Sequence, residues 1–561
     1  MNPHTLHHSH VSHARIRKPY RSASFLVALL FLLASLASIA SAAPNQPVAI
    51  QLLSVSDWHA QLDPLSVPGI VPNANVNVGG AAALSSYFKA DRAANPNTLT
   101  LTGGDAFGGS PPLSNFFNEE PAVKAMNLMG FDADALGNHN FDRGIAHLQQ
   151  MIDLADFTYV SANLKNVDAN LTGVEAFKLF DVGGIHVAVI GITNPEAPSV
   201  VRPGNFGTIE VTDPIAAANK ARAAAQAAGA KLVIAITHLG VEHTDPATGV
   251  ASGPLIDFAN NVGGFDVIFG DHTDVQYSGI HNNALVVENR SKGRTYSKTM
   301  LNVDPISGRI SHRSVEFVTP LSGAVTPDPA IVEMLDPYRA ALASAFDGVI
   351  GNATGLFPRG GNIERLQEVA LGNLVTDAMR WRYGTQLAFT NAGGLRTSLP
   401  SNYLPADKSL RRPTTGYTAG PPYDLVVGDV FSVLPFGNVV VTRTVTGAQL
   451  YQILEHSVSS IPGANGRFGQ VSGFRFTYDA SRPAGTRVVS VALADGTPIL
   501  PDSMPYTFAT NDFVNSGGDG YTMLAGGQGV TREVMADVVL EYIRSLHTIT
   551  PAIEGRISRL P

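Results

Sequence analysis

Cysteine is absent from the 561-residue sequence, and charged residues are scarce at 15%. The absence of cysteine excludes disulfide bonds and the attachment of a lipid to a thiol. No block of lysine or arginine stands out, and the formal net charge is −8. A chain of this kind is poorly suited to a nucleic-acid backbone, so we expect no nucleic-acid partner. Hydrophobic residues make up 44% of the chain, which is ample for a packed core.

Long apolar runs are also few, and the one that stands out lies near the N-terminus, at residues 25–40. Basic residues between positions 15 and 21 precede it, and Ala-Ser-Ala follows at 40–42. This order is typical of a secretory signal peptide, residues 1–42, cleaved near Ala42. We therefore expect a periplasmic or secreted protein without a stable membrane anchor. An uncleaved N-terminal anchor is the alternative, although the run is short for a membrane span.

The length of the chain predicts two substantial domains. Residues 46–320 alternate strand-like apolar runs with helical stretches, such as the alanine-rich helix expected over 214–228. This alternation indicates an α/β or α+β domain. Prolines gather in residues 320–329, so we place a linker with a connecting helix at 321–348. A second α/β domain is expected over 349–559.

Five short polar motifs follow apolar runs in the first of these domains. Because the carboxyl ends of parallel strands meet at one edge of a sheet, residues far apart in the sequence can converge there. Carboxylate, imidazole and amide groups together suit Zn, Mn or Fe better than Mg or Ca. The pattern therefore predicts a hydrolase with two divalent metal ions. The candidate ligands are Asp57, His59, Asp105, Asn138, His238 and His272.

Asp105 is the best candidate for a carboxylate that bridges two ions, because two preceding glycines leave the backbone room to enter the site. Asp57 and His59 project to the same side of an extended segment and suit one ion. The remaining three ligands suit the other. Taken singly, an Asp after a strand is more often a turn residue or a helix cap, and a lone His is usually structural. Five such motifs in succession favour the metal site.

The motifs Asp-x-His, Gly-Gly-Asp and Gly-Asn-His-x-Phe-Asp, followed by two histidine motifs, resemble the calcineurin-like metallophosphoesterases. The second half resembles the 5′-nucleotidase and UDP-sugar hydrolase family, so the likeness covers nearly all of the mature chain. It implies a four-layer β-sandwich flanked by helices, followed by a second α/β domain that binds substrate. It also implies that Asp57, His59 and Asp105 bind one ion. The implied ligands of the second ion are Asp105, Asn138, His238 and His272.

The Gly-Asn-His-x-Phe-Asp motif further implies a catalytic pair, His139 and Asp142. A phosphoester leaving group needs a proton or stabilisation of its charge, and an adjacent imidazole supplies either. Asp142 lies one helical turn beyond His139 and is placed to orient the imidazolium. The alternative interpretation makes Asp142 the N-cap of a helix through residues 145–151.

Three positions depart from the family's pattern. Asp271 stands before the last histidine, where the family usually has glycine. Asp274 stands two residues after that histidine, where the family has His, Gln or Asn. A carboxylate there can still bind the first ion, so Asp274 is included among the predicted ligands, although it adds negative charge. Asn140 replaces the usual Glu of the Gly-Asn-His motif, at a position with no obvious direct chemistry.

The second domain contains what resembles a nucleotide pocket. Residues 391–396 resemble the family's Asn-Gly-Gly-Gly-Ile-Arg loop, and arginine's planar fork suits phosphate oxygens. Two further loops resemble those whose phenylalanines sandwich the base, a contact that tolerates different bases. In isolation each phenylalanine fits a core position better. The predicted substrate-binding residues are Arg365, Asn391, Arg396, Phe436, Asn438, Phe513 and Asp519.

Together these features predict an exported two-domain phosphohydrolase that attacks nucleotides in line with a water activated between two metal ions. UDP-sugars and 2′,3′-cyclic nucleotides are further candidate substrates. The substrate is expected to bind between the domains, whose relative rotation the family resemblance implies. One alternative is a related two-metal hydrolase of another phosphoester or of a sulfur ester. Another is a secreted binding protein of the same fold without turnover.

Overall fold

The first strand, β1 (Val48–Val55), is apolar without alternation because both faces of its sheet are covered. Ile50 and Leu52 lie in one core, whereas Leu53 and Val55 lie in another. The computed structural model describes residues 46–71, 74–201, 204–245, 248–525 and 529–561. The predicted signal peptide lies outside the described residues.

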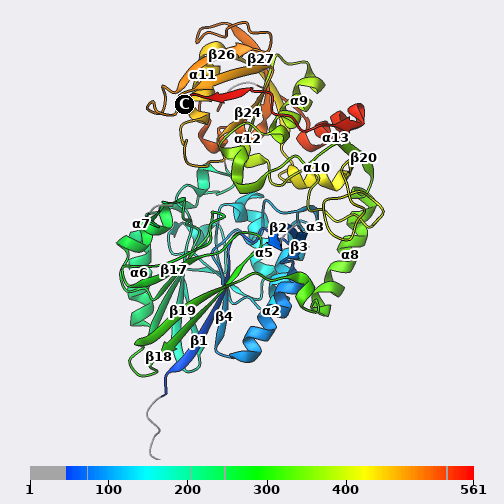
Figure 1. The fold of residues 1–561 in the computed structure, drawn as a ribbon. Coiled ribbons are helices and arrows are strands. Elements are labelled where there is room, and N and C mark those ends of the chain that lie inside the picture. The colour runs from blue at the N-terminus through cyan, green and yellow to red at the C-terminus, as the bar shows by residue number, and fades with distance from the viewer. Residues whose placement is uncertain (1–45, 72–73, 202–203, 246–247, 526–528) are drawn as a thin grey trace, which may run out of the picture.

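Two sheets form the centre of the first domain (Figure 1). The strand order of the larger is β19 (Ile310–Val318), β18 (Tyr296–Val303), β1, β4 (Thr98–Thr102), β5 (Ala133–Ala135), β6 (Thr158–Val160) and β8 (Val174–Glu175). The order of the smaller is β16 (Tyr277–His281), β17 (Ala284–Glu288), β15 (Val267–Gly270), β12 (Leu232–Thr237), β10 (Ile185–Ile192) and β9 (Phe177–Val182). Strands β1, β4 and β5 are mutually parallel, as are β10, β12 and β15.

Three apolar cores separate the layers of this domain. One lies between the two sheets, and each sheet has another on its outer face. The helices over the larger sheet are α2 (Ala81–Ala94), α4 (Glu120–Met129), α5 (Ile145–Leu154) and α8 (Pro329–Phe346). Those over the smaller sheet are α6 (Pro214–Ala227) and α7 (Pro254–Asn261). The result is a helix–sheet–sheet–helix sandwich, which confirms the predicted fold class.

Helix α6 shows how local sequence sets these boundaries. The Asp213 side chain caps it by accepting a hydrogen bond from the Ala216 amide at 2.7 Å, and Pro214 occupies the first helical position. Beyond its end, Gly229 adopts a φ of +98°, which a residue with a side chain rarely does. The helix predicted over 214–228 is therefore present nearly in full.

The second domain is built on a five-stranded sheet with helices on both faces (Figure 1). Its strand order is β24 (Gly469–Ser472), β21 (Leu387–Asn391), β27 (Pro505–Asn511), β23 (Val439–Thr446) and β28 (Val530–Val534). One face carries α9 (Ala370–Tyr383), α10 (Val427–Val433) and α13 (Met535–Leu546). The other carries α11 (Gly447–Ser457) and a small sheet of β26 (Val488–Leu493), β25 (Phe474–Tyr478) and β30 (Ile557–Arg559).

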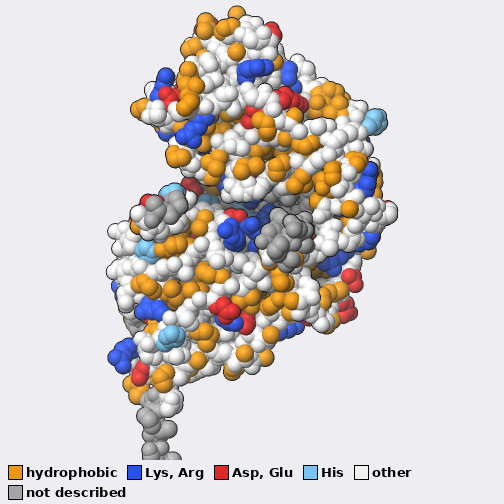
Figure 2. Space-filling model, viewed as in Figure 1, with side chains coloured by type: hydrophobic (Ala, Val, Ile, Leu, Met, Phe, Trp, Pro, Cys, Tyr) orange, Lys and Arg blue, Asp and Glu red, His pale blue; other side chains and the backbone are white. Residues whose placement is uncertain are grey.

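Helix α8 joins the two domains along one side of the molecule (Figure 1). Its apolar residues are buried against the first domain, while Phe346 at its end also contacts Phe431 of α10. The space-filling view shows the domains as two lobes pinched at their junction (Figure 2). Within the described residues, no helix is long and apolar enough to cross a membrane.

Candidate active site

The predicted metal ligands gather at the carboxyl ends of the parallel strands. Asp57 and His59 follow β1, Asp105 follows β4, and Asn138 follows β5 from the larger sheet; His238 and His272 follow β12 and β15 from the smaller. Three overlapping groups have potential ligand atoms within 4.8 Å of one another: His59–Asp105–His139, Asp105–His238–His272 and Asp57–His238–Asp271. Asp105 belongs to two of these groups, as expected of a bridging carboxylate.

His238 marks the tighter half of the centre. Its Nε2 atom lies 3.0 Å from Asp105 Oδ2 and 3.1 Å from Asn138 Oδ1. The Nδ1 atom of His272 lies 3.0 Å from the same nitrogen. Four donor atoms thus face one point from four different loops. Nitrogen and oxygen donors in such an arrangement fit a divalent transition metal.

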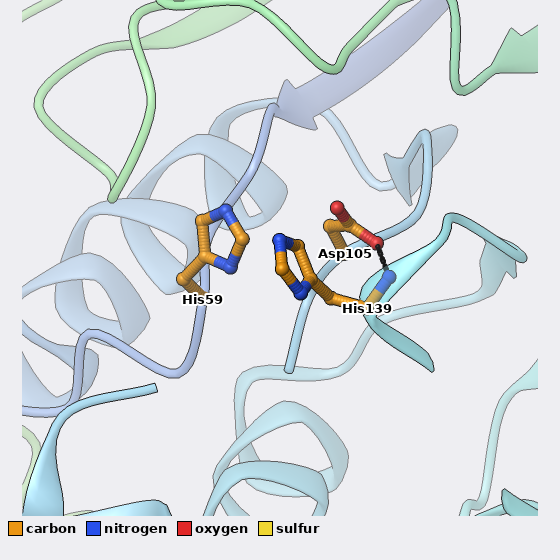
Figure 3. A group of neighbouring side chains, drawn as sticks. All are labelled: His59, Asp105 and His139. Atoms are coloured by element: carbon orange, nitrogen blue, oxygen red, sulfur yellow. Dashed lines mark hydrogen bonds between the residues drawn. The ribbon is translucent and has the colours of Figure 1, made fainter. Parts of the chain in front are cut away.

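His59 and Asp57 form the wider half. The Nε2 atom of His59 lies 4.0 Å from Asp57 Oδ1, and its ring meets the His139 ring edge-on at 5.1 Å between centroids. Figure 3 shows His59 and His139 facing each other with Asp105 beside them. The Nδ1 atom of His59 lies 2.7 Å from the Gly108 carbonyl, which leaves Nε2 for a metal. These residues therefore fit a second divalent ion.

Four of these ligands have an unusual backbone. Asp57, His59, Asp105 and His272 have φ values of 42°, 48°, 48° and 80°. Residues other than glycine rarely adopt positive φ, and such strain concentrates at functional sites where the surrounding structure maintains it. Bringing these four side chains to the site therefore requires strained backbone conformations.

Asp105 is held by the loop that carries the Gly-Asn-His motif. Its Oδ1 atom accepts a hydrogen bond from the His139 amide at 2.8 Å (Figure 3). Asn140, a departure from the family's pattern, accepts from the Asp105 and Gly137 amides at 3.2 and 2.8 Å. A Cβ atom at Gly137 would lie only 2.2 Å from Asp105 Oδ1, so glycine is required there. Burial raises the pKa of Asp105, but His238 and His139 outweigh it and hold that pKa below its usual range.

His139 and Asp142 form the contact that the motif implied. The Nδ1 atom of His139 lies 2.8 Å from Asp142 Oδ2, which also accepts from the Gly109 amide at 3.1 Å. Asp142 does not cap the following helix, because the N-cap of α5 is Gly144. The carboxylate is therefore engaged in orienting the imidazole, and His139 Nε2 faces the centre.

Asp271 ties the strand ends together. Its buried carboxylate accepts hydrogen bonds from the amides of Asp57 at 2.5 Å, His272 at 2.9 Å and Gly103 at 3.1 Å. These amides belong to three loops that carry metal ligands. The departure from glycine thus supplies a fixed acceptor between the two sheets, and Asp271 also joins Asp57 and His238 in one ligand group.

Asp274 is the one predicted carboxylate ligand that the structure does not bring into these groups. Its carboxylate pairs with Arg294 and accepts a hydrogen bond from the Ser291 amide at 3.1 Å. The Arg294 guanidinium and the Ser291 amide therefore occupy the carboxylate of Asp274, which was predicted to bind a metal ion. A role for Asp274 as a metal ligand stays a prediction.

Arg396 brings the second domain to the metal ligands. Its Nη2 atom lies 3.5 Å from both His59 Nε2 and His139 Nε2. The Phe436 ring stacks on His139 with centroids 5.6 Å apart, and the Arg396 guanidinium lies 5.5 Å from the same ring. Burial, with the nearby charges of Arg359 and Arg365, lowers the pKa of Arg396 to about 10.

The other predicted pocket residues make separate contacts within the second domain. Asn391 donates to Asp519 Oδ2 at 2.7 Å and accepts from Asn511 at 3.0 Å. Phe513 lies in α12 (Asp512–Asn515), next to Gly518 of the turn η7 (Gly518–Gly520), where a Cβ atom would strike the ring. Arg365 Nε lies 3.6 Å from Glu364. Asn438 instead donates to Asp512 at 2.8 Å within its own domain.

Two cationic residues at this junction belong to no motif and were missed. Arg359 donates to the Leu395 carbonyl at 2.9 Å and pairs with the buried Glu364 at 3.0 Å. Lys292 donates through Nζ to the Arg396 carbonyl at 3.3 Å, across the domain boundary. Burial and the charges of Arg359 and Arg396 lower the pKa of Lys292 to about 7. Isolated basic residues outside a repeated pattern give no sequence signal.

The fold and the site define a class of protein: a two-domain α/β protein whose clustered His and Asp side chains could hold metal and face an arginine of the second domain. A family model described as the 5′-nucleotidase C-terminal domain matches residues 349–526. The solved structure of a 5′-nucleotidase precursor from Thermus thermophilus has a TM-score of 0.80 at 29% identity. That likeness covers 91% of this chain and 99% of the other.

Curated relatives agree. The chain is 26% identical over 551 residues to the snake venom 5′-nucleotidase of Gloydius brevicauda, a match that covers 91% of this chain and 88% of that protein. It is 29% identical over 534 residues to Endonuclease YhcR of Bacillus subtilis. That match covers 92% of this chain but only 41% of the relative's length.

These likenesses confirm the resemblance seen in the sequence. Residues 349–526 match the 5′-nucleotidase C-terminal domain, and over 91% of its length the chain is similar to 5′-nucleotidases. Its relatives and its clustered His and Asp side chains support a metal-dependent phosphoester hydrolase.

Proposed function

We propose that this chain is an exported hydrolase that releases phosphate from nucleotides and holds two divalent ions of Zn, Mn or Fe. One observation carries the proposal. The guanidinium of Arg396, from the second domain, lies 3.5 Å from two histidines of the first, and Phe436 stacks on one of them. An arginine and an aromatic ring from one domain therefore meet a predicted metal ligand and the predicted catalytic histidine of the other.

The side chains at this junction have complementary roles. Bound divalent ions would lower the pKa of a water molecule and offset the charge on the phosphoryl oxygens. His139, with Nδ1 held by Asp142, presents Nε2 towards the reacting group and protonates the leaving oxygen. Arg396, which is buried, binds the phosphoryl oxygens through charge-assisted hydrogen bonds.

The second domain supplies the part of the site that recognises the nucleoside. Phe436 lies in a turn and Phe513 in the short helix α12, and Asn391 donates a hydrogen bond to Oδ2 of Asp519. We assign base stacking to the two rings and a ribose hydroxyl to Asp519. The predicted signal peptide supports export, which places this activity outside the cytoplasm.

A phosphate-release assay on the purified mature chain tests the proposal. The substrates are AMP, a UDP-sugar, 2′,3′-cyclic AMP, p-nitrophenyl phosphate, a sulfur ester and single-stranded DNA, each with and without a chelator. The DNA is included because one relative is named an endonuclease. We expect chelator-sensitive turnover, with nucleotides preferred over p-nitrophenyl phosphate. Preferred cleavage of the sulfur ester or the DNA would refute the nucleotidase assignment, and no turnover would favour a binding protein.

A further inference from the structure

The three histidines among the metal ligands differ in what holds their outer nitrogens. His59 Nδ1 faces the Gly108 carbonyl at 2.7 Å, and His238 Nδ1 faces the Gly103 carbonyl at 3.2 Å. The two backbone carbonyls leave the Nε2 atoms free for metal. His272 is turned the other way, because its Nδ1 atom faces the ligand cluster and its Nε2 atom points outwards.

The outer nitrogen of His272 meets a carboxylate instead of a carbonyl. Glu196 Oε1 lies 3.1 Å from His272 Nε2. A metal-bound histidine commonly donates its second N–H to a carboxylate or a carbonyl, which fixes the ring orientation and raises the basicity of the ligating nitrogen. A carboxylate has the stronger effect of the two, because the hydrogen bond is charge-assisted.

We propose that Glu196 is a positioning residue that orients His272 for the metal ion shared with His238 and Asp105. This inference rests on the metal centre of the proposed function. Glu196 acts through the imidazole and is not itself a ligand, since it belongs to none of the ligand groups found among the described residues. It precedes η3 (Ala197–Ser199), which follows β10 after a short loop.

The position of Glu196 also connects the metal centre to the other domain. The turn η3 contacts η7 of the second domain, and η7 contains Asp519. The charges of Glu196 and Asp519 both interact with that of Arg467. The carboxylate that orients His272 therefore lies on the segment of the first domain that meets the nucleoside-facing turn.

An ordinary surface ion pair would have little effect if removed, because exposed pairs contribute little to stability. The Glu196 side chain is 51% exposed, so that interpretation predicts no measurable consequence of its loss. The positioning role predicts a specific one, which is weaker binding of one metal ion in an otherwise stable protein.

The test is calorimetric titration of Mn²⁺ into chelator-stripped protein, with the parent, Glu196→Gln and Glu196→Ala. We expect Glu196→Ala to weaken one of two binding events by roughly 10–100-fold, the range for outer partners of metal ligands. Glu196→Gln should lose less, because its amide oxygen still accepts a hydrogen bond from His272. The melting temperature of the stripped protein should not change in either variant.

Glu210→Ala is the matched control, because Glu210 is an exposed glutamate of the same domain that pairs with Lys165. It should bind both ions like the parent. Parent-like titration of Glu196→Ala would overturn the inference, as would equal weakening by Glu210→Ala. The titration needs no substrate. If the parent binds two ions yet releases no phosphate from nucleotides, the proposed function fails while the role of Glu196 stands.

Discussion

The two domains hold their functional residues in different ways. In the first domain, ligands sit directly at the ends of buried strands, and buried acceptors such as Asp271 and Asn140 hold their backbone. In the second domain, Phe436 and Phe513 lie on a loop and a four-residue helix, next to glycines. Metal chemistry needs donor atoms fixed within fractions of an ångström, whereas stacking on a base tolerates movement. Loops anchored at buried strand ends therefore hold the predicted metal ligands, whereas a turn and a short helix hold the two rings predicted to stack on the base.

The charges of the two domains differ as clearly. The first domain presents carboxylates and imidazoles, which could bind cations. The second presents Arg359, Arg365 and Arg396, whose burial and mutual repulsion lower the pKa of Arg396. In the proposed function neither half is complete alone, because a phosphate group bound between them would be shared by metal ions on one side and guanidinium groups on the other.

The largest expected effect comes from removing the carboxylate shared by the two ligand groups. Asp105→Asn should lose both ions and lower turnover by more than the ~10²–10⁴-fold typical of an acid–base group. Elemental analysis and phosphate release measure the two losses. Asp257→Asn, on the exposed face of α7, is the control and should keep both. Normal metal content in an inactive Asp105→Asn protein would show that Asp105 does not bridge the ions.

His139→Ala separates catalysis from metal binding. It should keep both ions and lose turnover by roughly 10²–10⁴-fold, because the leaving oxygen loses its proton donor. Asp142→Asn should cause a smaller loss, since it removes only the partner of His139 Nδ1. Single-turnover kinetics with metal analysis measure both. Near-normal turnover of His139→Ala would remove it from the mechanism.

A buried ion pair in the second domain tests whether the stability of that domain also depends on buried polar contacts. Arg412 and Asp429 are fully buried, 2.5 Å apart, and Asp429 lies in the first turn of the helix that leads to Phe436. Arg412→Ala leaves an unpaired buried charge and should reduce the free energy of unfolding by about 3–5 kcal/mol. Urea denaturation measures this. Arg411→Ala is the control, because its pair with Asp424 is partly exposed to solvent and should matter far less. Equal losses would contradict the argument.

Substitution of Phe436 and of Phe513 separates effects on hydrolysis from effects on nucleotide binding. Phe513→Ala should weaken nucleotide binding by about 1–3 kcal/mol and leave hydrolysis of p-nitrophenyl phosphate nearly unchanged. Phe436→Ala should affect both substrates, because its ring also contacts His139 and Arg396. Steady-state kinetics on AMP and p-nitrophenyl phosphate distinguish them. A lowered melting temperature with equal losses from Phe513→Ala would assign that ring to the core.

Much of the architecture could be predicted from the sequence, because it depends on local patterns. Apolar runs ahead of the polar motifs predicted strands in the first domain, and the alanine-rich stretch at 214–228 predicted α6. Asp142 was ambiguous between a cap and a partner of His139, and only the contact at 2.8 Å distinguished them. Asp274 matched a ligand position in the sequence, yet Arg294, from a later turn of the chain, engages its carboxylate.

The sequence by itself determined which residues could serve as metal donors and where they lie in the chain, since side-chain chemistry and strand ends depend on local sequence. Tertiary structure alone decided how these groups are held. Asp271 acts through three amides from separate loops, Glu196 reaches His272 from the end of a different strand, and Arg396 arrives from the other domain. Such contacts join residues far apart in the sequence, and chain folding, not local propensity, brings them within hydrogen-bonding distance.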